Sequence, residues 1–236
     1  MRAAVFHQLK QPLTVETVPD PTPGEGQVVV EVCRCGICGS DLHLTADALF
    51  GVPAGAVLGH EYAGRIAAIG RGVDRVKVGD HVAMMPLHSC GTCLHCLRGE
   101  PAWCSIMRVD GGGYGEYALA RQHQCVPLPR TVSLEDGALV EPMAVGLHGV
   151  RLAQSQPGDR VLVLGAGPIG LASIYWARRL GADALRRRQV RRDVQNWHWP
   201  WARMYSSIRP MPHLKRPFVR WVDRRMSSTN AWVCPA

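Results

Sequence analysis

The chain has 236 residues, of which 47% are hydrophobic, so it can bury the core of one large domain or two modest domains. Its net charge of +8 is unevenly distributed: residues 1–183 carry 15 Lys and Arg against 17 Asp and Glu, a net of −2, whereas residues 184–236 carry 12 Lys and Arg against 2 Asp and Glu, a net of +10. The positive charge therefore belongs to the tail and says little about the partners of the main body. The first ten residues lack the apolar region of a secretory signal, and the longest uncharged stretch, 161–177, is short for a membrane span and broken by glycine and proline, which favours a soluble, cytoplasmic protein.

The first part of the chain is typical of a β-rich domain. Residues 28–33 (VVVEVC) form a β-type run behind a Pro- and Gly-rich entry. Further β-like segments lie at 63–69, 81–84 and 116–120, and glycines and prolines separate them closely. We therefore predict a small barrel-like domain over residues 1–132.

A helical pattern follows this domain. Ser133 is a predicted helix N-cap, with Glu135 and Asp136 in the first turn, where carboxylates suit the positive end of the helix dipole. Apolar residues then recur at helical spacing as far as Val150.

A strand and a second helix come next. Residues 160–164 (RVLVL) have the pattern of a buried strand, and 168–180 have a helical pattern. A strand, a glycine turn and a helix open a βαβ unit, so the predicted fold class is α/β with a β-rich part. Residues 133–183 would be a linking helix and the start of a second domain, and 184–236 an atypical tail rich in Arg, Trp and Pro.

Four of the nine cysteines cluster within fifteen residues. They follow the spacing C-x2-C-x2-C-x7-C and are Cys90, Cys93, Cys96 and Cys104. In a chain without a secretion signal, such clustering argues for a metal rather than disulfides. Four thiolates satisfy tetrahedral zinc and leave no open position, so we predict a structural zinc lobe over residues 90–104. The alternative is four unrelated buried cysteines, which does not explain the turn-forming Gly91 and Gly99.

A second set of metal-ligand residue types has a different composition. It consists of Gly36-Ile37-Cys38-Gly39-Ser40-Asp41-Leu42-His43 and, further on, Gly59-His60-Glu61. A mixed set of Cys, His and Glu ligands usually leaves one position open for water or substrate, which is typical of a catalytic site. Each piece is weak when taken alone, because a lone His is more often an ordinary polar residue and a lone Cys is more often buried.

Together these motifs resemble a known family. Gly59-His60-Glu61-x2-Gly64-x5-Gly70-x2-Val73 resembles the signature of the zinc-containing medium-chain alcohol dehydrogenases. The segment around Cys38, the four-cysteine lobe and Val140-Glu141-Pro142 resemble that family in the same order. The resemblance covers residues 1 to about 183. It implies a GroES-like catalytic domain followed by a Rossmann, doubly wound domain, which would be incomplete here.

The resemblance also implies roles for individual residues. Cys38 and His60 would hold a catalytic zinc, with Glu61 as a carboxylate that ligates directly or through water. Glu141 stands where many alcohol dehydrogenases have a third ligand cysteine, and a glutamate there resembles the sorbitol, threonine and butanediol dehydrogenase branch. The alternative for Glu141 is a carboxylate on the surface of a helix.

The implied chemistry is hydride transfer between a secondary alcohol or polyol and a nicotinamide. A catalytic zinc would lower the pKa of the alcohol as a Lewis acid, and NAD or NADP would accept the hydride. Ser40 resembles the hydroxyl relay of the family, and His43 resembles the histidine that passes the proton to solvent. The alternative is that Ser40 and His43 only cap local turns.

A glycine turn follows the predicted strand at 160–164. Its glycines permit a tight turn and a close backbone approach to the pyrophosphate of a dinucleotide, and the helix N-terminus supplies the anion site. A lone GxGxxG is weak, but this one has the required strand before it and helix after it. The predicted cofactor-binding residues are Gly165, Gly167, Pro168, Ile169 and Gly170.

The tail departs from the family pattern. A second strand and a ribose-binding residue are expected where the chain reads Arg-rich at 186–192, and no β run precedes this segment. The arginines would suit a 2′-phosphate only if a strand held them. Five of the seven tryptophans lie in the tail, and only 80 residues remain from Pro157 onward, against roughly 130–150 for a complete doubly wound sheet. The abrupt shift suggests a frame shift in the gene; the alternative is a divergent, disordered tail.

Three functions compete. The first is an NAD(P)-dependent zinc alcohol or polyol dehydrogenase, or the remnant of one, acting on a small molecule, with a homo-oligomer compatible with it. The second is a non-catalytic module structured by zinc whose cofactor site is incomplete. The third, a nucleic-acid binder, is disfavoured because the basic tail and the cysteine lobe lie far apart in the chain; we expect neither a nucleic acid nor a membrane as partner. The particular alcohol and the choice between NAD and NADP stay open.

Overall fold

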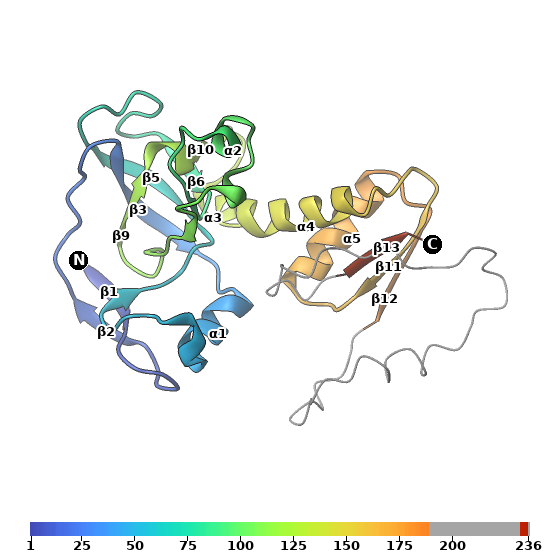
Figure 1. Ribbon diagram of the computed structural model, residues 1–236, viewed down its shortest axis with the longest axis horizontal. Coiled ribbons are helices and arrows are strands. Elements are labelled where there is room, and N and C mark those ends of the chain that lie inside the picture. The colour runs from blue at the N-terminus through green and yellow to red at the C-terminus, as the bar shows by residue number, and fades with distance from the viewer. Residues whose placement is uncertain (189–231, 236) are drawn as a thin grey trace. The chain divides into compact units, whose positions relative to one another are not determined.

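The computed structural model describes residues 1–188 and 232–235 (Figure 1). The chain forms two compact units, Met1–Glu141 and Pro142–Ala236. Helix α4, Val140–Leu152, begins in the first unit and continues into the second. None of the helices in the described ranges has both the length and the apolar character that crossing a membrane requires.

The first unit is built on a five-stranded antiparallel sheet in the order β10-β6-β5-β3-β9. Its strands are β3 (Gln27–Cys35), β5 (Tyr62–Ile69), β6 (His81–Met84), β9 (Tyr117–Arg121) and β10 (Cys125–Pro127). The pairing of β3 with β5 shifts register at Val29/Val30 and at Val32/Arg34, and irregularities of this kind bend a sheet. The sheet is therefore curled into a half-barrel, which confirms the predicted barrel-like character of this part of the chain.

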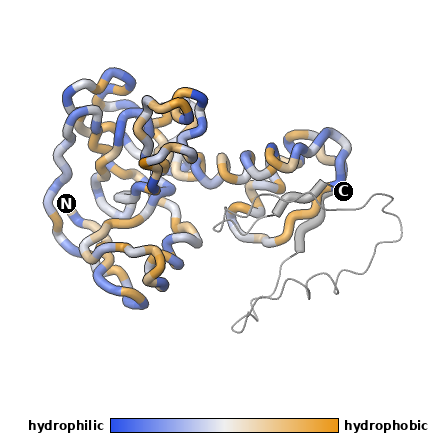
Figure 2. The backbone as a smooth tube through the Cα atoms, viewed as in Figure 1, coloured by the Kyte–Doolittle hydropathy of each residue, from blue (hydrophilic) through white to orange (hydrophobic). Residues whose placement is uncertain are grey.

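The core of this unit packs on one face of this sheet. Alternate residues of β9, Ala118 and Ala120, are buried, as a strand with one covered face requires. They pack with residues of the neighbouring strands, among them Val28, Val30, Tyr62, Ile66, Val82 and Met84. In Figure 2 hydrophobic residues concentrate along the strands, and hydrophilic residues gather on the loops between them.

Smaller elements surround the main sheet. A second sheet in the order β2-β1-β4 consists of β1 (Arg2–Phe6), β2 (Thr14–Thr17) and β4 (Ala56–Val57). The short strands β7 (Leu87–His88) and β8 (Arg108–Val109) pair with each other. The short helices of this unit are α1 (Gly39–Ala46), η1 (Ala48–Phe50), α2 (Leu94–Leu97), η2 (Pro101–Trp103), η3 (Gln122–Gln124) and α3 (Leu134–Gly137).

The predicted helix after residue 132 is interrupted. Ser133 caps α3, because its hydroxyl accepts a hydrogen bond from the backbone N–H of Asp136 at 3.0 Å. The expectation of one continuous helix is wrong, since α3 ends before Ala138 and α4 starts at Val140. Pro142 explains the break: inside a longer helix its ring would clash with the carbonyl of Ala138, four residues earlier, whereas proline is tolerated in a first turn.

The second unit contains the predicted strand and helix. Strand β11 (Arg160–Leu164) leads into α5 (Pro168–Arg179), and Val161, Val163 and Ala177 pack together in its core. This is the strand–turn–helix start of a Rossmann-type unit.

Two further strands flank β11. Strand β12 (Ala184–Arg188) pairs with it in parallel, and β13 (Trp232–Pro235) pairs with it antiparallel. The expectation that no strand follows the glycine turn is therefore wrong, because the backbone of 184–188 pairs with β11 although its composition is rich in arginine. The predictions for Arg191, Arg192, most of the tail tryptophans and the frame shift lie outside the described residues.

Candidate active site

The four clustered cysteines lie together in the lobe between β7 and β8. One sulfur from each of Cys90, Cys93, Cys96 and Cys104 lies within 4.8 Å of the others. Backbone N–H groups point at these sulfurs: that of Cys93 donates to Sγ of Cys90 at 3.2 Å, and that of Cys90 donates to Sγ of Cys104 at 3.4 Å. Hydrogen bonds from Thr92 and Cys93 lower the pKa of Cys90 to about 5. Four thiolates at this spacing fit a zinc ion and leave no position for a substrate.

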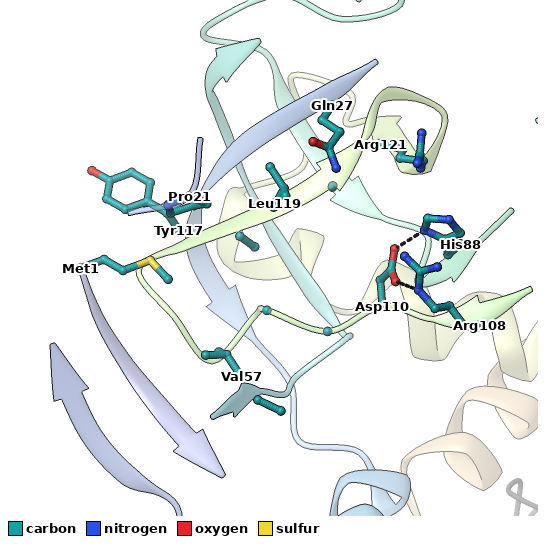
Figure 3. A pocket seen from close by; sticks show the side chains of 15 residues that line it. Met1, Pro21, Gln27, Val57, His88, Arg108, Asp110, Tyr117, Leu119 and Arg121 are labelled. Atoms are coloured by element: carbon teal, nitrogen blue, oxygen red, sulfur yellow. Dashed lines mark hydrogen bonds and ion pairs between the residues drawn. The ribbon is translucent and has the colours of Figure 1, made fainter. Parts of the chain in front are cut away.

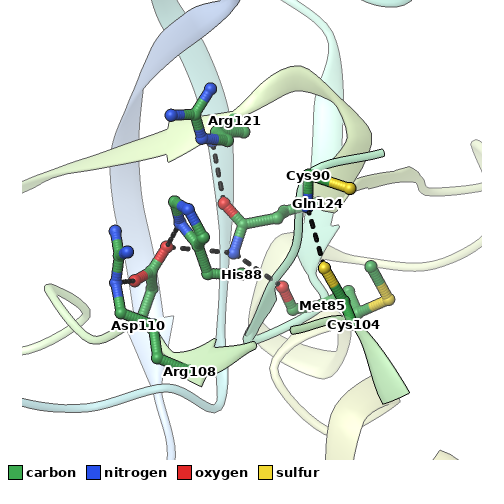
Figure 4. A network of polar contacts seen from close by, with 8 residues as sticks. All are labelled: Met85, His88, Cys90, Cys104, Arg108, Asp110, Arg121 and Gln124. Atoms are coloured by element: carbon green, nitrogen blue, oxygen red, sulfur yellow. Dashed lines mark hydrogen bonds and ion pairs between the residues drawn. The ribbon is translucent and has the colours of Figure 1, made fainter. Parts of the chain in front are cut away.

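A buried polar network closes the base of this lobe (Figure 4). His88 precedes the lobe and Asp110 follows it, and Nδ1 of His88 lies 2.9 Å from Oδ2 of Asp110. The fully buried Gln124 donates to the same oxygen and to the carbonyl of Met85, both at 3.3 Å, and accepts from the N–H of Arg121 at 2.9 Å. The network therefore ties both ends of the lobe to the turn between β9 and β10.

A cavity of about 440 Å³ lies beside this network (Figure 3). Its lining includes His88, Arg108, Asp110 and residues of β9. Neither Cys38, His60 nor Glu61 lines it, so this cavity is distinct from the second ligand cluster.

That second cluster consists of Cys38, His60 and Glu61. One ligand atom from each lies within 4.8 Å of the others, and His60 and Glu61 are buried. Cys38 is the N-cap of α1, whereas His60 and Glu61 immediately precede β5. The N–H of Gly36 donates to the carbonyl of Glu61 at 2.7 Å, which joins the two segments.

Asp41 supports this cluster from behind. It is 4% exposed, and its Oδ2 accepts hydrogen bonds from the N–H of Cys38 at 2.9 Å and from the hydroxyl of Tyr114 at 2.8 Å. Its Oδ1 lies 3.4 Å from Nδ1 of His60 and has no hydrogen-bond partner in the described part of the chain. Burial alone would raise the pKa of Asp41, but the contacts with His60, Tyr114 and Cys38 lower it, so the carboxylate is ionised near neutral pH.

The electrostatics of the cluster suit a cation. Burial disfavours a charged imidazole at His60, but Asp41 and Cys38 outweigh this effect and raise the pKa of His60 to about 10. The buried Oδ1 of Asp41, which has no partner among the described residues, is placed to accept a hydrogen bond from Nδ1–H of His60, as carboxylates do behind metal-bound histidines. The donor set of one thiolate, one imidazole and one carboxylate therefore fits zinc.

Glu141 lies close to this cluster but outside the 4.8 Å set. Burial, above all, raises its pKa to about 7; His60 opposes the increase, and Glu61 and Asp41 add to it. These electrostatic interactions put Glu141 in the neighbourhood of His60, and its ligation of a metal stays a prediction.

Ser40 and His43 lie in α1, directly after Cys38. They are three residues apart in the helix, a spacing that brings side chains to the same side. Ser40 is half-buried and His43 is exposed, and a proton path through this pair stays a prediction.

Two supporting residues escaped the sequence interpretation. Asp41 had a local signal, because it is the third residue of a helix whose N-cap is Cys38 and it bonds back to the N-cap backbone. Tyr114 had no local sequence signal, since it lies 73 residues after Asp41 in a loop of the barrel.

The glycine turn of the second unit contains all five predicted cofactor-binding residues. Gly167 is the N-cap of α5, and Pro168 occupies the first turn. A Cβ on Gly170 would lie 2.3 Å from the carbonyl oxygen of Gly165, so the turn can close this tightly only with glycine at that position. The geometry suits the approach of a pyrophosphate, and binding of a dinucleotide stays a prediction.

Comparison with known proteins agrees with these features. Residues 24–130 match the family model described as the alcohol dehydrogenase GroES-like domain. The chain is 38% identical over 194 residues to a sorbitol dehydrogenase of Bacillus subtilis, which covers 78% of the chain and 54% of that protein. It is 38% identical over 175 residues to the galactitol 1-phosphate 5-dehydrogenase of Escherichia coli, which covers 72% of the chain and 50% of that protein.

A solved structure gives the same result. The crystal structure of 2R,3R-butanediol dehydrogenase from Bacillus subtilis superimposes with a TM-score of 0.70 at 34% identity, over 79% of this chain and 57% of that one. The chain thus spans about half the length of the relatives it matches. By sequence, fold and ligand clusters, the chain belongs to the zinc-containing medium-chain alcohol dehydrogenase family, in the branch of the sorbitol, galactitol and butanediol dehydrogenases.

Proposed function

We propose that this chain carries the catalytic domain of a zinc-dependent oxidoreductase that transfers hydride between a secondary alcohol or polyol and NAD or NADP. The observation that carries the proposal is the gathering of Cys38, His60 and Glu61 within 4.8 Å, apart from the closed four-cysteine lobe. Two separate ligand sets suit two different tasks, because a four-thiolate site holds a fold and a mixed site binds substrate.

The catalytic zinc, when bound, would supply a Lewis acid at the substrate oxygen. Cys38 and His60 would hold it, with Glu61 and Glu141 as nearby carboxylates. Ser40 would take the proton of the alcohol and His43 would release it to solvent, which agrees with the half-buried and exposed positions of the two side chains. Gly165–Gly170 would bind the pyrophosphate of the dinucleotide.

The proposal places the enzyme in the cytoplasm, a reducing compartment in which a four-cysteine cluster stays available for metal. The eight cysteines from Cys33 to Cys125 form no disulfide. Polyols and diols come first among candidate substrates, because the similar proteins are named for sorbitol, galactitol 1-phosphate and butanediol.

A second function, that of a zinc-structured module without activity, is favoured by one observation in the second unit. Strand β11 has a parallel neighbour in β12 but an antiparallel one in β13. Dinucleotide-binding sheets of the Rossmann type place parallel strands on both sides of their first strand. The described strands of this unit do not supply that arrangement.

Activity assays separate the two functions. The full chain, loaded with zinc, is incubated with sorbitol, galactitol 1-phosphate or 2,3-butanediol and with NAD or NADP, and formation of the reduced nicotinamide is followed by absorbance. If the chain is an enzyme, we expect turnover of one of these substrates, and we expect that turnover to disappear in Cys38→Ser. Zinc at both sites without turnover, and without binding of a reduced dinucleotide detected by fluorescence, would favour the inactive module.

A further inference from the structure

The loop between β8 and β9 runs directly past the segment that carries His60. The N–H of Gly113 donates to the carbonyl of Gly59 at 2.9 Å, and the N–H of Tyr114 donates to that of Leu58 at 3.0 Å. The carbonyl of Tyr114 in turn accepts from the N–H of Ala4 in β1 at 2.9 Å. The backbone of Tyr114 is thus held on both sides, which fixes where its side chain begins.

The Tyr114 ring packs against Gly59, the residue before His60. A Cβ on Gly59 would lie 2.5 Å from Cδ1 of the ring, and Gly59 has φ +84°, which glycine adopts readily. Only a glycine therefore lets the ring come this close to the His60 segment.

The Tyr114 hydroxyl reaches the other ligand segment. It donates to Oδ2 of Asp41 at 2.8 Å, and the same oxygen accepts from the N–H of Cys38 at 2.9 Å. The second oxygen of Asp41 is thereby turned toward Nδ1 of His60 at 3.4 Å. One carboxylate joins the backbone of one predicted ligand to the side chain of another, and Tyr114 sets its orientation.

We propose that Tyr114 is a positioning residue for the catalytic metal: it fixes the Asp41 carboxylate and so holds Cys38 and His60 at the spacing that binds zinc. The proposal rests on the metal site of the proposed function. Without the hydroxyl, the Cys38 N–H is the one partner that Oδ2 of Asp41 keeps among the described residues, and the carboxylate gains freedom to rotate away from His60. The imidazole then loses part of the restraint that orients it toward a metal.

A purely structural role for the hydroxyl makes a different prediction. If Tyr114 only satisfied its own polar group in the barrel, its removal would lower the stability of the whole unit and affect both metal sites alike. A positioning role instead weakens the mixed site and spares the four-cysteine lobe, so the two sites within one protein serve as internal controls for each other.

The experiment is metal titration of the full chain, first stripped of metal. Cobalt(II) is added because its visible spectrum distinguishes a four-thiolate site from a site with one thiolate, and zinc competition against a chromophoric chelator then gives the affinity of each site. The variants are Tyr114→Phe, Asp41→Asn and the control Tyr117→Phe, whose hydroxyl makes no hydrogen bond to the described residues. Circular dichroism confirms that each variant is folded.

We expect Tyr114→Phe to weaken zinc at the mixed site by about tenfold, the lower end of the range for outer contacts of metal ligands, and Asp41→Asn to weaken it at least as much. The zinc affinity of the four-cysteine lobe should be unchanged in Tyr114→Phe and Asp41→Asn. In Tyr117→Phe the zinc affinities of both sites should equal those of the unmodified chain. Equal affinities in Tyr114→Phe and the unmodified chain, or equal losses at both sites, would overturn the positioning role while the proposed function stands. A chain that binds metal only at the lobe would overturn the proposed function and this inference with it.

Discussion

The lobe cluster draws its four ligands from fifteen residues of one loop, whereas the mixed cluster gathers Cys38, His60 and Glu61 from two segments with α1, η1 and β4 between them. In the lobe, the groups that stabilise the sulfurs are neighbouring backbone N–H groups such as those of Thr92 and Cys93. In the mixed cluster the supporting groups are side chains, Asp41 from α1 and Tyr114 from a loop 73 residues further along the chain. We therefore expect the lobe to need its metal in order to fold, and the mixed site to need the fold in order to bind its metal.

The largest expected effect comes from removing a lobe ligand. Cys93→Ser or Cys96→Ser should lose one zinc and unfold the lobe, because metal-binding energy of about 10–16 kcal/mol is folding energy in structural zinc sites. Cys38→Ser should also lose one zinc but keep the fold. Metal content and thermal unfolding of the full chain measure both effects, with the exposed Cys33→Ser as control. The division between the clusters is wrong if Cys38→Ser unfolds the chain as readily as Cys93→Ser.

A smaller effect tests the dependence of the mixed site on its barrel. Gly59→Ala forces a positive φ on alanine and pushes a methyl group into the Tyr114 ring, at a cost of about 2–5 kcal/mol. Gly26→Ala is the matched control, since its φ is also positive but the added Cβ meets nothing within 4 Å; it should cost about 1–2 kcal/mol. The free energy of unfolding in urea and the zinc content are measured for both variants, and only Gly59→Ala should lose zinc from the mixed site. Similar results for both variants would mean that the Tyr114 contact is unimportant.

Disrupting the polar network at the base of the lobe should lower the free energy of unfolding by as much as Gly59→Ala does, or by less. Gln124→Leu removes the bonds to Arg121, Met85 and Asp110, and the N–H of Arg121 and the carbonyl of Met85 lose this partner while Asp110 keeps His88 and Arg108, which should cost about 1–3 kcal/mol. The free energy of unfolding in urea measures this, and the exposed Gln8→Leu serves as control. A neutral Gln124→Leu would show that the lobe stands independently of the barrel.

The smallest effect concerns an exposed contact beside the Tyr114 loop. Glu116 accepts from the N–H of Arg2 at 2.8 Å and from its guanidinium at 2.9 Å, and these contacts lower the pKa of Glu116. A lowered pKa gives stability that is present above the ordinary value near 4.5 and is lost as the pH falls through the folded-state pKa. Glu116→Gln should therefore lower the melting temperature slightly at pH 7, and the difference from the unmodified chain should shrink as the pH falls below 4.5. A difference that grows toward acid would contradict this assignment.

These contrasts also explain how much the sequence could predict. The cysteine lobe was readable because its ligands are spaced for a single loop, and β3, β5, β6 and β9 were readable from short β-type runs between turns. The break at Ala138 follows from Pro142 and could have been inferred. The contact of Tyr114 with Asp41 could not, because it depends on how the curled sheet brings a loop past Gly59. Strand β12 was missed because pairing with β11 sets its conformation, whereas its arginine-rich composition gave no strand pattern.

The most direct test of the central claim is the zinc content of the full chain, measured by native mass spectrometry together with elemental analysis. Two independent ligand sets predict two zinc ions per chain, and one in Cys38→Ser, with the remaining ion at the lobe. A single zinc in the unmodified chain that persists in Cys38→Ser would contradict the account, because the mixed cluster would then hold no metal.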